Sequence, residues 1–152
     1  MVVKNESQAL CIAVEMERRA IRVYERALML AEDPQVRAGI TEILSDERRH
    51  LQRFSEMRQC HQLDAAEEQL LISSMAAEVL FTGGVMEMKR EQALTTLRGL
   101  YQYAADSEAD AARTYAEFAK KCADAKVQEV FMDIVREESS HLVERRGKLA
   151  GT

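Results

Sequence analysis

The chain has 152 residues, one proline and a mild net charge of -5, a composition that fits a single helical domain with a hydrophobic core. Its basic residues form no block, which argues against nucleic-acid binding. No apolar run reaches the roughly 20 residues that a membrane-spanning helix needs, and the N-terminus has no apolar signal sequence. The sequence therefore predicts an all-α cytoplasmic protein, in which Cys11, Cys60 and Cys122 remain reduced.

The first predicted element is an antiparallel helical hairpin over about residues 5–58. Its first helix begins near Asn5 or Ser7, both suitable caps, and carries apolar residues at helical spacing. Asp33 and Pro34 mark the turn, because aspartate is a preferred helix cap and proline suits the first helical position. A second helical pattern follows at once, and so short a turn makes the two helices antiparallel.

A long connection, about residues 59–90, separates this hairpin from a second one, predicted over about residues 91–147 with its turn at Asp124. Apolar residues in the connection indicate an additional helical stretch. The length of the connection is explained if a pseudo-twofold axis relates the hairpins, because the chain must then cross the length of the bundle. Residues 1–152 are thus predicted to form one domain of two hairpins and a crossover.

One pattern of glutamate and histidine occurs twice in the chain. Glu17 is followed thirty residues later by Glu47, and His50 comes three residues after that. Adding 91 to each residue number gives the same three residue types again. In each Glu-x-x-His pair, the two side chains share one helical face. The six residues of the repeated pattern are Glu17, Glu47, His50, Glu108, Glu138 and His141.

The repeated residues are predicted to lie at one level of each hairpin. Glu17 lies 16 residues before Asp33, and Glu47 and His50 lie 14 and 17 residues after it. At about 1.5 Å per residue, all three are roughly 21–26 Å from the turn, and the spacing about Asp124 is the same. A single Glu-x-x-His pair is common on helix surfaces. Four carboxylates and two imidazoles at one depth instead favour a two-metal site.

The charges of this ligand set favour two divalent, redox-active ions. Four carboxylates balance two divalent cations, and a bridging oxide can neutralise the charge that oxidation adds. Mixed carboxylate and imidazole ligation suits iron, with manganese as an alternative, whereas structural zinc prefers thiolates. Glu47 and Glu138 are expected to bridge the two ions, and the other four residues to bind one ion each.

Further residues are predicted to support the ligands. Tyr24 and Tyr115 lie seven residues after the single glutamates of the pattern, on the same helical face. We expect their phenols to hydrogen-bond ligand carboxylates, or to donate an electron or proton; the alternative is that they are ordinary core tyrosines. Asp46 and Glu137 either orient the histidines across the core or are ordinary exposed or capping acids. His61 has no counterpart under the shift and is not expected to bind metal.

The repeated Glu…Tyr…Glu-x-x-His pattern resembles the ferritin-like di-iron superfamily, and within it the rubrerythrin family, over nearly the whole chain. The resemblance implies a four-helix bundle, a non-haem di-iron centre, chemistry with peroxide or dioxygen, and a homodimer. Rubrerythrins also carry a four-cysteine rubredoxin domain, which three scattered cysteines cannot form, so the electron donor is expected to be external. A further glutamate of the family is replaced by Ala111, which predicts a symmetric site.

The expected function is that of a rubrerythrin-like di-iron oxidoreductase that reduces hydrogen peroxide, dioxygen or both. Two alternatives remain open: a ferroxidase or iron-handling protein, and a di-iron oxygenase acting on an organic substrate. The six-ligand set is also like that of bacterioferritin, although only eleven residues follow His141, too few for the fifth helix of a ferritin cage. A structural module with a vestigial site is disfavoured because the ligand set is complete.

Overall fold

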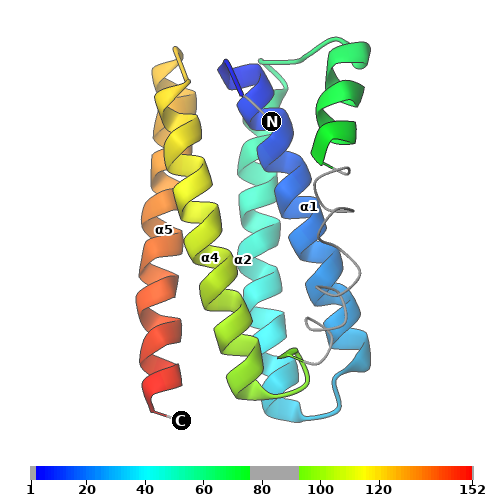
Figure 1. Cartoon of the computed structure of the whole chain (residues 1–152), viewed down its shortest axis with the longest axis vertical. Helices are drawn as coiled ribbons and strands as arrows, with labels where there is room; N and C mark the ends of the chain where they lie inside the picture. Colours follow the sequence, from blue (N-terminus) through cyan, green and yellow to red (C-terminus); the bar gives the residue numbers. More distant parts are fainter. Residues whose placement is uncertain (1–2, 76–92, 152) are drawn as a thin grey trace.

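The computed structural model describes residues 3–75 and 93–151 of the chain. This part of the chain is helical and contains no strand, which confirms the predicted all-α class. No helix in it has both the length and the apolar character needed to cross a membrane. Its four long helices lie side by side (Figure 1): α1 (Glu6–Leu30), α2 (Pro34–Arg58), α4 (Leu97–Lys120) and α5 (Ala125–Ala150).

Both predicted turns are present, and both are formed by local capping. Asp33 caps α2, where its carboxylate accepts a hydrogen bond from the Gln35 backbone N–H at 2.8 Å and Pro34 occupies the first turn. Asp124 caps α5 in the same way through the backbone N–H of Lys126. As a result α1 packs mainly on α2, and α4 mainly on α5. Two helical hairpins result from these contacts.

The helix boundaries refine the sequence-based ranges. Asn5, rather than Ser7, caps α1. The helix α4 begins at Leu97, because the side chain of Thr96 caps it by accepting a hydrogen bond from the backbone N–H of Gly99 at 3.0 Å. At the other end of this hairpin α5 continues to Ala150, beyond the predicted limit near residue 147.

The crossover is described in part. Residues 65–75 are helical, as the apolar spacing in the connection predicted, whereas residues 76–92 lie outside the described residues. The helical part lies beside the first half of α1 (Figure 1), where the Gln8 side-chain amide donates a hydrogen bond to Glu67 at 2.8 Å. The helices α2 and α4, which the crossover joins, run in the same direction (Figure 1).

The buried apolar residues of the described ranges form two clusters, one toward each end of the helices. The first cluster contains Val14 and Phe54, and the second contains Ile21 and Leu44. Glu17 lies on α1 between Val14 and Ile21, and it is only 2% exposed. A layer of buried polar side chains therefore separates the two apolar clusters at this level of the helices.

Candidate metal centre

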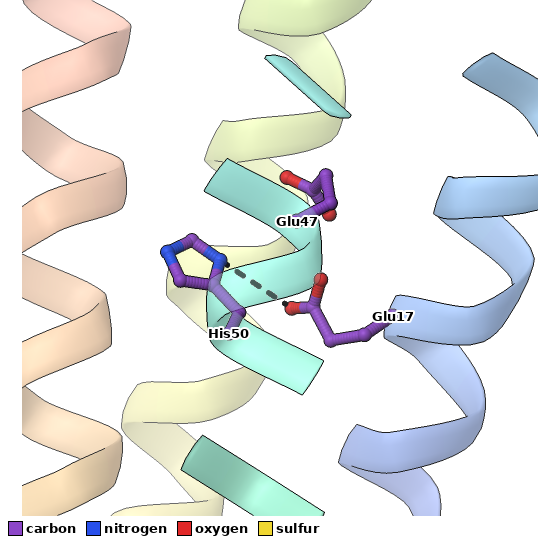
Figure 2. A group of neighbouring side chains, drawn as sticks. All are labelled: Glu17, Glu47 and His50. Atoms are coloured by element: carbon purple, nitrogen blue, oxygen red, sulfur yellow. Dashed lines mark ion pairs between the residues drawn. The ribbon is translucent and has the colours of Figure 1, made fainter. Parts of the chain in front are cut away.

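The first hairpin brings the first three residues of the repeated pattern together. Glu17 extends from α1 toward α2, which carries both Glu47 and His50 (Figure 2). One potential ligand atom of each residue lies within 4.8 Å of the others. Glu17 Oε1 is 3.7 Å from His50 Nδ1, and both side chains are almost completely buried. The group has the residue types and the proximity that a metal ion requires.

The second hairpin forms the matching group from Glu108 on α4 and from Glu138 and His141 on α5. Potential ligand atoms of these three residues also lie within 4.8 Å of one another. The two groups are in contact, because His50 Nδ1 is 3.1 Å from Glu138 Oε1. The structure therefore brings all six residues of the repeated pattern to one place, between the two apolar clusters.

Burial and mutual repulsion disfavour the charged forms of two of these carboxylates. Burial raises the pKa of Glu47 well above its usual value, and the negative charge of Glu17 raises it further. Burial and the charge of Glu138 raise the pKa of Glu108 to about 8, against the opposing effect of Arg145. Without a bound cation, part of this cluster therefore holds protons at neutral pH.

For Glu17 and His50, the surroundings instead favour the charged form of the side chain. Burial acts to raise the pKa of Glu17, but its contacts with His50 and Glu47 outweigh burial and hold that pKa below its usual value. Burial acts to lower the pKa of His50, but the carboxylates of Glu138 and Glu17 raise it to about 9. In the metal-free protein, a protonated imidazole thus supplies positive charge among the carboxylates.

The two predicted supporting tyrosines differ in their contacts. Tyr115 donates a hydrogen bond from its phenol to Glu17 Oε1 at 2.7 Å, as the sequence predicted. Tyr24 is equally buried, but its ring packs edge-on against Tyr103 with centroids 5.9 Å apart. No hydrogen bond joins Tyr24 to Glu108 in the described part of the chain. The two tyrosines therefore occupy equivalent positions in the sequence but make different contacts.

Asp46 and Glu137 lie near the two histidines, as the first of the two roles considered for them requires. Glu137 Oε2 lies 3.3 Å from His50 Nε2, and Asp46 Oδ2 lies 3.6 Å from His141 Nε2. Each acid thus lies in ion-pair contact with the histidine of the opposite hairpin, without a hydrogen bond between them among the described residues. Arg49 forms ion pairs with both acids, at 3.2 Å from Asp46.

Arg145 is a component of the centre that the sequence analysis missed. Its side chain is 1% exposed, and its Nε lies 3.7 Å from Glu108 Oε1. Its Nε and Nη2 have no hydrogen-bond partner in the described part of the chain, which is unusual for a buried guanidinium. A sequence signal existed: Arg145 lies one turn after His141, where the 91-residue shift pairs it with the apolar Phe54.

The remaining histidine and the cysteines belong to none of these groups. His61 Nε2 lies 3.0 Å from the Asp124 carboxylate, at the cap of α5. Cys11 is buried, Cys60 is exposed, Cys122 is partly exposed, and all three are free thiols. None of these residues belongs to a group of potential metal ligands in the described part of the chain.

Comparison of the chain with protein-family models, curated proteins and solved structures gives no match. The interpretation of the centre therefore rests on its residues. Carboxylate oxygens and imidazole nitrogens are the ligand types that divalent iron and manganese accept in proteins. Each group of three residues could hold a metal ion.

Proposed function

We propose that this protein is a ferritin-like di-iron oxidoreductase that reduces hydrogen peroxide, dioxygen or both. In this proposal the four long helices form a ferritin-like bundle with pseudo-twofold-related hairpins, and the protein is a homodimer related to the rubrerythrins. An external donor supplies its electrons. The six ligands are those of the repeated pattern: Glu17, Glu47, His50, Glu108, Glu138 and His141.

One observation carries the proposal. Six buried side-chain atoms in the described residues lack a hydrogen-bond partner, and four of them belong to Glu17, His50 and Glu108. Buried polar atoms are nearly always hydrogen-bonded, so unpaired polar atoms that converge on one place indicate a site for a bound ligand. A metal cation can satisfy the unpaired oxygens of Glu17 and Glu108 and the Nδ1 atom of His50 together, whereas His50 Nε2 faces Glu137. The residues present thus fit a metal centre, for which we propose two iron ions.

The remaining residues of the centre have roles that follow from their contacts. When bound, two iron ions supply one electron each for the two-electron reduction of the oxidant. Burial raises the pKa of Tyr115 well above 10, so its phenol stays protonated and holds Glu17 in place. In this proposal Glu137 and Asp46 orient the histidine rings, with which they are in ion-pair contact. The two apolar clusters keep bulk water from the ligands on both sides.

The proposal is tested by metal analysis of protein purified from cells grown in ordinary medium, together with melting curves before and after chelation. We expect about two iron ions per chain and a lower melting temperature for the chelated protein, because a metal that binds only the folded state stabilises it. Protein that contains no iron, or that melts at one temperature in both states, contradicts the proposal.

Iron handling is a second candidate, favoured by one observation. Asp46, Glu137 and His141 form a partly exposed group whose ligand atoms also lie within 4.8 Å of one another. His141 belongs both to this group and to the buried group with Glu108, so the two are contiguous. Aerobic loading distinguishes the candidates: many iron ions per chain indicate storage or transfer, and about two indicate an oxidoreductase.

A further inference from the structure

The two halves of the centre differ one turn beyond each histidine. Beyond His50 lies Phe54, which is completely buried and packs against the ring of Tyr115 with centroids 5.1 Å apart. Beyond His141 lies Arg145, which is 1% exposed. The first position therefore borders a neutral aromatic pair, and the second borders a buried positive charge, because arginine stays protonated in proteins.

Among the described residues, Glu108 is the main counter-charge of Arg145. Glu108 Oε1 lies 3.7 Å from Arg145 Nε, and Glu108 Oε2 has no hydrogen-bond partner in the described residues. The other acid within reach, Glu144, is also 3.7 Å away, but its side chain is 49% exposed and therefore screened by water. Arg145 is the only buried residue of α5 beyond Glu138, so no other buried side chain of that segment stands beside it.

We infer that Arg145 makes the two metal positions unequal, in contrast to the symmetric site expected from Ala111. The group of Glu17, Glu47 and His50 binds a divalent cation first and more tightly. The group that contains Glu108 binds the second cation more weakly, because Glu108 serves both the metal and the Arg145 guanidinium. This inference rests on the proposed metal centre and adds an order of filling to it.

The physical reason is the repulsion between the guanidinium and an incoming cation. Both charges are buried, and charges away from water interact more strongly than exposed ones. To bind the second cation, Glu108 must give up part of its interaction with Arg145. In the described part of the chain the guanidinium already lacks hydrogen bonds at Nε and Nη2. At the first position Tyr115 instead stabilises the charged form of Glu17 through its hydrogen bond.

The order of filling is tested by anaerobic calorimetric titration of metal-free protein with Fe²⁺. We expect two steps in the natural protein, with dissociation constants that differ by at least tenfold. In Arg145→Phe, which places the residue of the first hairpin in the second, and in Arg145→Gln, which removes the charge, we expect the difference to fall to threefold or less. Arg145→Gln keeps a polar side chain in case the phenylalanine variant does not fold.

Two control variants separate the charge of Arg145 from other effects. Arg145→Lys keeps the charge, and Arg146→Gln removes a neighbouring charge from an exposed position; both are expected to retain two steps. Glu17→Gln should abolish the tight step, and Glu108→Gln the weak one. Equal affinities in the natural protein, unchanged steps in both charge-removing variants, or loss of the tight step in Glu108→Gln would overturn the inference. If the protein bound no Fe²⁺ at all, the proposed metal centre itself would be wrong.

Discussion

Tyr115 on α4 donates a hydrogen bond to Glu17 on α1, with 2.7 Å between Oη and Oε1. The bond joins the two hairpins at the level of the candidate metal centre, and both side chains are buried. A carboxylate acceptor makes such a bond stronger than a bond between neutral groups. The structure describes no matching hydrogen bond between Tyr24 and Glu108, and the Tyr24 ring instead packs against Tyr103.

Replacing Tyr115 should therefore lower the free energy of unfolding more than replacing Tyr24 does. We expect Tyr115→Phe to lower the unfolding free energy of the metal-free protein by about 1.5–3 kcal/mol, the range for hydrogen bonds to charged groups. Tyr24→Phe removes the same atom from an equally buried ring without breaking a bond to a ligand, and it should cost clearly less. Denaturant unfolding of the two variants measures the difference, and equal losses would show that the bond to Glu17 contributes nothing specific.

Removal of an expected bridging ligand should change the metal content. We expect Glu47→Ala and Glu138→Ala each to lower the iron content from about two ions per chain to one or none, because each carboxylate is expected to contact both ions. Glu42→Ala is the matched control, since Glu42 is an exposed glutamate on the same helix as Glu47. Elemental analysis of the purified variants is the measurement. Two ions per chain in both bridging variants would contradict the assignment.

The metal-free protein should lose stability as pH rises from about 5 to 9. Glu108 has a pKa raised from 4.5 to about 8, and His50 has one raised from 6.5 to about 9, so the folded state holds more protons than the unfolded state in this range. The stability they contribute is complete below the unfolded pKa values and is lost as pH rises through the folded ones. The lowered pKa of Glu17 acts only below about pH 4.5.

The affinity for iron should instead rise as pH rises from about 5 to 9, because a metal ion must displace the protons on Glu108 and His50. Melting temperatures of chelated protein at pH 6 and pH 9, beside iron titrations at the same two values, provide the comparison. Chelated protein that is more stable at pH 9 than at pH 6 would show that the carboxylates are not held close together in solution.

The reduced centre should react with both peroxide and dioxygen without strong preference. The reason is the small side chain of Ala111, partly buried on α4 one turn after Glu108, which leaves room for either oxidant. Stopped-flow oxidation of anaerobically reduced protein measures both rates. Oxidation by dioxygen that is slower by several orders of magnitude would instead indicate the selectivity of a peroxidase.

Local signals in the sequence predicted most of the fold. Asp33, Pro34 and Asp124 mark both turns because helix capping depends on only a few neighbouring residues. The approach of the three pattern residues within each hairpin also followed from counting along two helices from a shared turn. These features needed no knowledge of how the hairpins pack against each other.

The contacts between the hairpins could not be predicted in the same way. Tyr24 and Tyr115 occupy equivalent places in the sequence, yet only Tyr115 reaches a ligand carboxylate, because the residues that surround the two rings differ. Arg145 was missed because the repeat drew attention to residues that recur, whereas this residue interrupts the repeat. An arginine is also usually exposed, and its burial follows only from the packing of α5.

The division of the core into two apolar clusters has a consequence for how cooperatively the domain unfolds. Each cluster can stay packed while the polar layer between them opens, and among the described residues only Leu51 packs against both. Without metal, the amide hydrogens near Glu17 and Glu138 should therefore exchange with solvent before those within either cluster. Ions that bind residues of all four long helices would couple the two ends, so that the whole domain unfolds as one unit.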